Sequence, residues 1–315
     1  MKKNLLFVLL SLFYCSTLAA QSTATFETEA VGSTTFTDNG KTFTITSTSP
    51  AFFDIYEFNG GGWNGSSADN KFIDNSGSVA FNTPVQFKIS SSSGPFTLKS
   101  FYLFLAQSNL NLNVTGSVTI KGLLAGAPQY TVVSNGPHNG NMAVSNGFKF
   151  FDMSTLGGSN NSNIAIDEFE ITTTVDIAYV ALDAMTWGCP PVTVSPVSQT
   201  NVACKGGATG AATVTVSGGT GFTYNWTPGN PTGDGTASVT GLTAGNWTCT
   251  VTNSCGQSSS TSFTITEPNS TISATAVVTN IACYNGNTGA INLSPSGGTA
   301  PYTFDWGGGI TSEDR

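Results

Sequence analysis

The chain has 315 residues, of which only 9% are charged, and its formal net charge is −8. A nucleic-acid-binding protein needs a basic face, so this composition excludes nucleic acid as a partner. Hydrophobic residues make up 39% of the chain and alternate with polar residues over many short runs, which excludes disorder and indicates an all-β protein.

The N-terminus predicts export. Two lysines precede the apolar run 5–14, and small residues follow up to Ala20, so residues 1–20 have the pattern of a secretory signal peptide. The run is too short for a transmembrane helix, which needs about 20 apolar residues, and no other stretch predicts one. Lipidation at Cys15 is the weaker alternative, because bulky residues precede it. We expect an exported protein, located outside the cell or at its surface.

Residues 21–188 predict one β-sandwich domain. Alternating runs such as 42–46, 101–105 and 179–182 are separated by clusters of Gly, Asn, Ser and Pro. Many short strands with turns between them indicate a sandwich or a jelly roll. The Cys-Pro-Pro sequence at 189–191 predicts a linker, because proline cannot continue a strand ladder.

Two segments after this linker contain the same motifs in the same order. The first, 192–268, runs from Asn-Val-Ala-Cys through Ser-Gly-Gly-Thr to Trp226 and beyond. The second, 273–315, runs from Asn-Ile-Ala-Cys through Ser-Gly-Gly-Thr to Trp306. Such self-similarity indicates an array of modules. The alternating strands within them predict small immunoglobulin-like sandwiches.

The second repeat lacks the part equivalent to residues 235–268 of the first. We therefore expect the chain to continue beyond Arg315 into further repeats. An open sheet edge and an unfinished core predict that residues 273–315 are only marginally stable alone.

These motifs resemble the SprB repeat, which occurs in large surface proteins of gliding and related Bacteroidota. The resemblance rests on the sequences at 204–207, 217–226, 242–247 and 263–268, and on their counterparts in 280–306. It implies an exported surface protein, often carried by the type IX secretion system, that acts as an adhesin.

Five of the six cysteines follow the predicted signal peptide. In an oxidising compartment they indicate disulfides, and the absence of a Cys-x-x-Cys pair disfavours zinc. The SprB resemblance implies the pair Cys204–Cys255, which leaves Cys189–Cys249 as a second bond and Cys283 without a partner here. Alternatively, Cys249 is a small buried apolar residue.

The two ends of the first domain, 25–29 and 179–187, resemble the first and last strands of jelly-roll carbohydrate-binding and lectin-like modules. Many such modules bind a structural calcium ion through one acidic residue on each of these strands. The resemblance implies a Ca²⁺ site at Glu27 and Asp183, whose oxygens suit this cation. The alternative is that Glu27 faces solvent and Asp183 caps a turn. Asp69 could also be a calcium ligand, but a hairpin turn is the favoured interpretation.

An aromatic stretch at 52–63 adjoins a glycine-rich loop. Trp63, Tyr56 and Asn64 are candidates for glycan contact, because aromatic faces stack on sugar rings and amides bond to hydroxyls. The favoured alternative is that Tyr56 and its phenylalanine neighbours belong to the core and only Trp63 lies near the surface.

No catalytic motif is present. Glu168 and Glu170 are spaced as a glycosidase carboxylate pair could be, but alternation places them on a solvated strand face. We expect a non-enzymatic adhesin whose first domain binds an extracellular glycan or surface and whose repeats form a stalk. The alternatives are a purely structural spacer and the glycan-targeting part of a secreted hydrolase.

Overall fold

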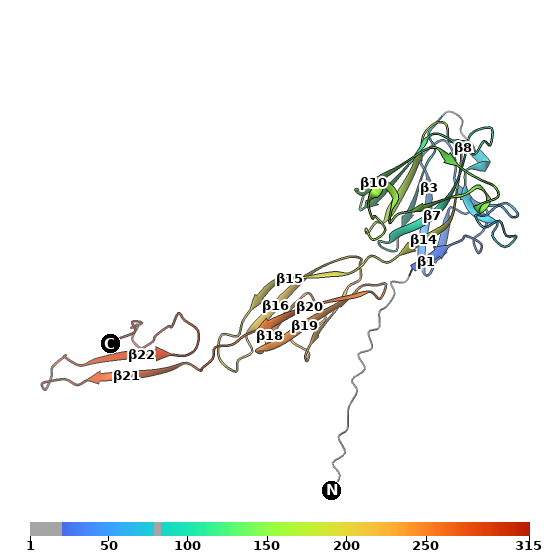
Figure 1. Cartoon of the computed structure of the whole chain (residues 1–315). Helices are drawn as coiled ribbons and strands as arrows, with labels where there is room; N and C mark the ends of the chain where they lie inside the picture. Colours follow the sequence, from blue (N-terminus) through green and yellow to red (C-terminus); the bar gives the residue numbers. More distant parts are fainter. Residues whose placement is uncertain (1–20, 79–82) are drawn as a thin grey trace, which may run out of the picture. The chain divides into compact units, whose positions relative to one another are not determined.

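A computed structural model describes residues 21–78 and 83–315. The predicted signal peptide and Cys15 lie outside the described residues. The chain divides into two compact units between Pro191 and Val192, and Figure 1 shows that both consist of strands. The regular elements that the described residues form are strands and three short 3₁₀ turns, which confirms the all-β class. No helix in this part of the chain is long and apolar enough to cross a membrane.

The first unit is a β-sandwich built from two antiparallel sheets (Figure 1). The first, named here the β14 sheet, has the order β12-β7-β14-β5-β4, with β1 beside β14. Its strands are β1 (Gln21–Ala24), β4 (Asp54–Glu57), β5 (Lys71–Asp74), β7 (Thr97–Ala106), β12 (Lys149–Asp152) and β14 (Tyr179–Gly188).

The second, named the β13 sheet, has the order β10-β9-β13-β6-β3-β2. Its strands are β2 (Thr35–Asp38), β3 (Lys41–Ser47), β6 (Gln86–Ser91), β9 (Ser117–Leu124), β10 (Ala127–Asn135) and β13 (Glu168–Thr173). A short separate ladder joins β8 (Asn113–Val114) to β11 (His138–Asn139). Three 3₁₀ turns, η1 (Ser76–Ser78), η2 (Ser145–Gly147) and η3 (Leu156–Gly158), lie in loops.

The core of the first unit consists of alternate residues of these strands. Phe43 and Ile45 of β3, and Phe169 and Ile171 of β13, are buried, while the residues between them are more exposed. Phe101 and Phe151 of the β14 sheet stack with ring centroids 5.4 Å apart. Because successive side chains of a strand point to opposite faces, the alternation that predicted the strands also determines which residues form the core.

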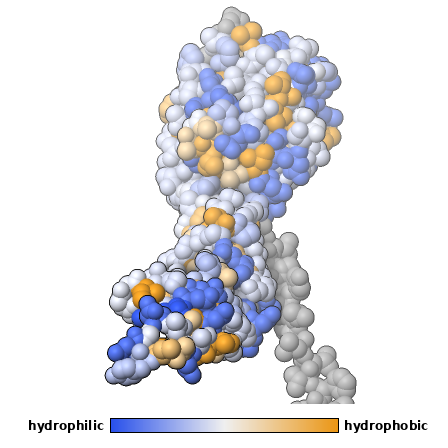
Figure 2. Space-filling model, turned by 90° about the vertical axis from the view of Figure 1, so that its left-hand side faces the viewer, coloured by the Kyte–Doolittle hydropathy of each residue, from blue (hydrophilic) through white to orange (hydrophobic). Residues whose placement is uncertain are grey.

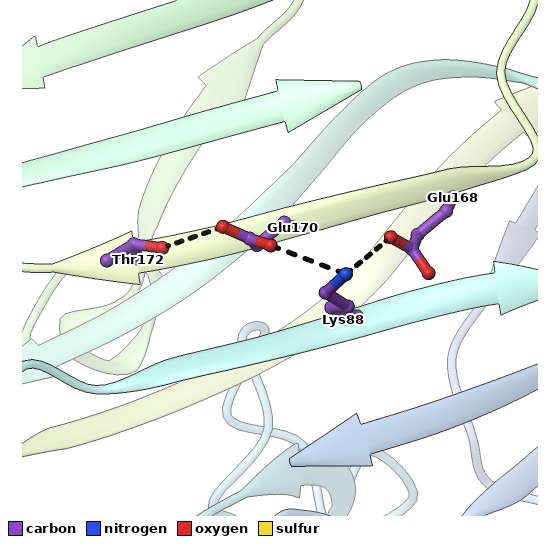
Figure 3. A network of polar contacts seen from close by, with 4 residues as sticks. All are labelled: Lys88, Glu168, Glu170 and Thr172. Atoms are coloured by element: carbon purple, nitrogen blue, oxygen red, sulfur yellow. Dashed lines mark hydrogen bonds and ion pairs between the residues drawn. The ribbon is translucent and has the colours of Figure 1, made fainter. Parts of the chain in front are cut away.

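The outer face of the β13 sheet is polar. Lys88 Nζ lies 2.8 Å from Glu168 Oε1 and 3.6 Å from Glu170 Oε2 (Figure 3). The hydrogen bond to Glu168 is the largest cause of the raised pKa of Lys88. The two glutamates therefore lie on the same outer strand face, as the alternation predicts, and share one cation.

The first repeat of the second unit is a small sandwich with the sheets β15-β16-β18 and β17-β19-β20 (Figure 1). Its core surrounds Trp226, which is fully buried and donates its indole N–H to the Thr236 carbonyl at 2.9 Å. The strands are β15 (Thr193–Thr200), β16 (Gly210–Ser217), β17 (Thr223–Thr227), β18 (Ser238–Leu242), β19 (Gly245–Thr252) and β20 (Ser258–Ile265).

The second repeat forms one two-stranded ladder between β21 (Ser273–Thr279) and β22 (Ala290–Ser296). Val277 and Val278 of β21 remain exposed, with 71% of the surface of Val277 accessible, and Ile291 and Leu293 of β22 are only half-buried. In the first repeat the facing sheet supplies Trp226 and Trp247 to cover the corresponding apolar residues. The second repeat has no such cover within the described residues.

The cysteines differ from the predicted pairing. Cys189 and Cys255 are disulfide-bonded, whereas Cys204 and Cys249 are free, so the pairs Cys204–Cys255 and Cys189–Cys249 are wrong. Cys283 is also free.

The fold of the repeat gives the reason. Cys204 lies in the loop that contacts the end of β20, where Val202 N–H donates to Thr266 O. Cys255 lies in the turn before β20 begins. The strand between them spans eight residues, or about 25 Å at roughly 3.3 Å per residue, far beyond the reach of a disulfide.

Cys249 is instead a small buried apolar residue, which was the alternative prediction. It is fully buried in the core of the first repeat, and burial raises the pKa of its thiol to about 11.

Thiol labelling of residues 21–315 tests this assignment. We expect maleimide to modify Cys204 and Cys283 in the native protein and Cys249 only after denaturation. Cys189 and Cys255 should react only after reduction. Native Cys204 that resists labelling until a reductant is added would contradict the structure.

Candidate ligand-binding site

The first and last strands of the first unit are antiparallel neighbours. β1 pairs with β14 so that Ala24 lies opposite Met185. This pairing brings the chain that follows β1, which contains Glu27, toward the middle of β14, which contains Asp183. The sequence predicted that these two residues would lie close together.

Asp183 is fully buried in β14. Its Oδ2 accepts the Trp63 N–H at 3.0 Å, and its Oδ1 accepts the Ala184 N–H at 2.6 Å. Burial raises the pKa of Asp183 to about 8; the hydrogen bond from Trp63 opposes this shift, and the charges of Asp69 and Glu27 add to it. The negative charges of Asp69 and Glu27 therefore act on the Asp183 carboxyl group. Asp183 does not cap a turn at the surface.

Glu27 and Asp69 hold the same loop. Glu27 Oε1 accepts the N–H groups of Asn70 and Lys71, both at 3.1 Å. Asp69 is buried, and its Oδ2 accepts the Asn64 N–H at 2.9 Å. Asp69 is thus a third member of the acidic group. From the sequence a turn was favoured there over a calcium ligand, because nothing local shows that this turn folds back over β14.

The backbone is strained beside both predicted calcium ligands. Phe26, just before Glu27, has φ 63°, and Ala184, just after Asp183, has φ 47°. Non-glycine residues in such sparsely populated conformations cost about 1–3 kcal/mol each and gather at functional sites. The carboxylates are nevertheless separated, since no three His, Cys, Asp or Glu side chains of the described chain are grouped closely enough to hold a metal ion.

The loop between β4 and β5, residues 58–70, is anchored at several points. Phe58 N–H donates to Asn70 O at 2.8 Å and closes the loop. Asn146 donates its amide to Gly60 O at 2.9 Å and to Gly62 O at 3.2 Å. A side chain at Gly62 would place Cβ 2.5 Å from Asp69 Cγ, so the close approach of loop and carboxylate requires glycine there.

This loop borders a groove on the outer face of the β14 sheet. Buried Phe72, Phe148 and Ala181 form an apolar cluster on this face, and Trp63, Tyr102 and Phe104 pack against it. The groove has a volume of about 310 Å³. Its lining is mostly aromatic or aliphatic: Tyr56, Phe58, Phe72, Phe104, Leu110, Met142, Phe148, Tyr179, Val180 and Ala181, with Asp74, Asn75, Ser76, Asn146 and Gly61.

The three predicted glycan-contact residues differ in their exposure and in whether they line the groove. Tyr56 lines the groove with 37% of its surface exposed, so the favoured expectation that it belongs to the core is wrong. Trp63 is partly buried and stacks on Tyr102, with ring centroids 4.4 Å apart and planes 22° apart. Asn64 is exposed, and its Oδ1 accepts the Ser66 N–H at 2.8 Å.

Other groove residues were missed from the sequence. Phe104 comes from β7, Tyr179 from β14, and Met142 and Phe148 from the loops before β12. Their convergence depends on strand order, for which the sequence offers no local signal. Tyr56 and Phe58, the latter 62% exposed, are the aromatic residues of the groove that belong to the stretch recognised in the sequence.

The comparisons with known proteins concern mainly the second unit. Residues 197–231 and 275–311 match the model of the SprB repeat. One matched segment lies in each of the two repeated modules. Repeats of this family are typical of surface proteins, which agrees with the expected extracellular location. No curated protein matches the chain.

Two solved structures show distant similarity. One is the C-terminal 282-residue fragment of intimin in complex with the intimin-binding domain of the translocated intimin receptor, with 14% identity and a TM-score of 0.27 over 59% of this chain and 58% of that chain. The other is the M60 catalytic domain with the CBM51-1 and CBM51-2 domains of Clostridium perfringens ZmpB, with 11% identity and a TM-score of 0.21 over 79% of this chain and 30% of that chain. This chain therefore spans less than two thirds of either structure, and similarity of this degree carries no functional argument.

The buried Asp183 predicts a pH dependence. Its pKa rises from 3.8 to about 8 on folding, so between these values the folded protein binds more protons than the unfolded one. In metal-free buffer, the free energy of unfolding of the first unit should therefore fall as the pH rises from about 4 to about 8.

The variant Asp183→Asn cannot ionise, so its stability should depend less on pH over this range. At acidic pH it should be less stable than the wild type by about 1 kcal/mol, because one backbone N–H loses its acceptor. Denaturant titrations across the range measure both effects. Equal pH dependence in the two proteins would show that Asp183 does not carry this proton.

Proposed function

We propose that the first unit is the ligand-binding head of an exported, adhesin-like surface protein and that the SprB repeats form its stalk. The observation that carries this proposal is the aromatic groove on the outer face of the β14 sheet. The outer face of an antiparallel sheet is ordinarily polar, and apolar patches on such surfaces commonly mark binding sites.

The two outer faces of the sandwich differ in chemistry. Lys88, Glu168 and Glu170 give the β13 sheet a charged outer face, whereas Phe72, Phe104 and Phe148 lie beneath the groove on the other. Hydrophobic surface is gathered in separate patches among hydrophilic residues on the side drawn in Figure 2. Because the aromatic groove lies on one outer face and the charged residues lie on the other, this difference supports a local contact site on the β14 sheet.

The ligand of this head is an extracellular glycan or another surface component. Aromatic side chains with an exposed face, such as Tyr56 and Phe58, offer stacking surfaces for sugar rings. The exposed Asn64 amide lies on the same loop and can bond to hydroxyl groups. Binding of this kind is reversible, and many copies on one cell would multiply its strength. The proposal assigns the chain no catalytic role.

A spacer role for the first unit is the alternative. A spacer would not need an exposed aromatic groove, whose apolar surface carries an aggregation risk. The groove therefore favours the head over the spacer.

Calcium binding belongs to this proposal. The predicted pair Glu27 and Asp183 would supply two hard oxygen donors of the type that Ca²⁺ prefers, completed by backbone carbonyls. The raised pKa of Asp183 marks a position where positive charge would be favourable. Bound Ca²⁺ would supply a structural charge that holds loop 58–70 against β14.

A surface-binding test addresses the groove directly. The full chain should bind to selected members of a glycan and polysaccharide array, and Tyr56→Ala and Phe58→Ala should each weaken this binding about tenfold, the effect of losing one stacking contact. Phe52→Ala removes an exposed aromatic that does not line the groove and should bind as the wild type does. Loss of binding in all three variants, or in none, would contradict the proposal.

Thermal unfolding in Ca²⁺ and in EDTA tests the metal. Because Ca²⁺ must displace the proton of Asp183, whose pKa is about 8, the calcium-induced rise in Tm should be larger at about pH 9 than at about pH 6. Asp183→Asn should reduce the rise. An unchanged Tm at both pH values would rule out calcium at these residues.

A further inference from the structure

The groove has an unusual electrostatic character. Asp74 is the one charged side chain that lines it within the described part of the chain. On the neighbouring strand β4, Asp54 lies directly opposite Asp74 in the register. Its negative charge adds to the local potential. The groove is therefore an apolar space with a carboxylate at its wall and no countercharge among its lining residues.

Aromatic rings surround the same space from several strands and loops. Phe72 lies 6.2 Å from Tyr56 and 6.1 Å from Phe148, and Phe148 lies 5.6 Å from Phe104, measured between ring centroids. The planes are inclined to one another by 53–69°, so the rings that line the groove do not form a flat platform. The face of an aromatic ring carries negative charge and attracts cations.

The side-chain amides and the serine that line the groove already make hydrogen bonds within the protein. Asn75 donates its amide to Ala178 O at 2.9 Å and accepts the Val180 N–H at 3.0 Å. Ser76 donates both its N–H and its hydroxyl to Asp74 Oδ1, and the Asn146 amide donates to Gly60 and Gly62. A ligand group entering the groove would therefore find few hydrogen-bond partners beyond Asp74 and the hydroxyls of Tyr56 and Tyr179.

These three features select one chemical class. Burying a hydroxyl without a partner is costly, which disfavours a sugar ring deep in the groove. A lysine ammonium has three N–H donors to satisfy, and Asp74 can accept few of them. A quaternary ammonium group has no N–H, carries a charge spread over apolar methyl groups, and is recognised by aromatic rings.

We propose that the groove binds an alkylated ammonium group, of the trimethylammonium type, between Tyr56, Phe72, Phe104 and Phe148, with Asp74 as its counterion. This inference rests on the proposed function and specifies which feature of a surface ligand the groove selects. The sugar or other carrier would then lie outside the groove, near Phe58 and Asn64.

The test compares choline with its neutral analogue, in which carbon replaces nitrogen. The full chain is titrated with each by NMR or calorimetry at about pH 8, where Asp74, whose pKa is raised by burial to about 6, is ionised. We expect saturable choline binding at least about tenfold tighter than that of the analogue. Equal affinities, or no saturable choline binding, would overturn the inference.

Two variants and one change of pH separate the charge from the shape. Asp74→Asn should weaken choline binding about tenfold and leave the neutral analogue unaffected, and Phe52→Ala should alter neither. Lowering the pH of the wild type below about 6, where Asp74 is protonated, should weaken the binding of choline but not the binding of the neutral analogue. This measurement still decides the matter if the Asp74 variant fails to fold.

The outcome is distinct from that of the proposed function. If Tyr56→Ala abolishes binding to the array while choline does not bind the wild type, the groove is a ligand site but the ammonium inference is wrong. If choline binds equally well to wild type and Tyr56→Ala, the inference is also wrong.

Discussion

The first unit depends on one buried carboxylate that joins the end of its chain to an early loop. Asp183 lies in the last strand of the unit, fully buried, and accepts the Trp63 N–H of loop 58–70. An unpaired buried polar group is costly, so this bond determines where the loop can lie. The raised pKa of Asp183 is the electrostatic cost of that anchor, and a proton or a cation can lower it.

The groove follows from the position of this loop. Asn146 holds the loop from the other side, at Gly60 and Gly62, so Phe58 and Gly61 form a wall over the apolar face of the β14 sheet. A change in the charge of Asp183 would act on this wall through Trp63. The acidic group and the groove are thus two parts of one arrangement. In the proposed function, the acidic group would position loop 58–70 and the aromatic residues would contact the ligand.

Much of the fold could be predicted from the sequence, because strand alternation determines which residues are buried. Phe43, Ile45, Phe169 and Ile171 are core residues for this reason. The repeated motifs likewise identified the SprB modules. The cysteine pairing could not be derived, since it depends on which ends of β20 the loops occupy.

The site was predictable only in part. Glu27 and Asp183 were named through a resemblance at the two ends of the domain. Asp69 was assigned to a turn in preference to a calcium ligand, because its place beside Asp183 depends on how loop 58–70 folds back. Tyr56 was expected in the core because aromatic residues usually are, whereas the groove leaves it partly exposed. Local pattern gives the face of a strand, and only the strand order shows which faces meet.

Hydroxyl-radical footprinting of the full chain bound to a surface that captures it tests the central claim most directly. The account predicts that oxidation of Tyr56, Phe58 and Met142 decreases on binding, while the exposed Phe52 and Phe150 react as in the free protein. Protection confined to the SprB repeats, with the groove residues unchanged, would contradict the assignment of the first unit as the binding head.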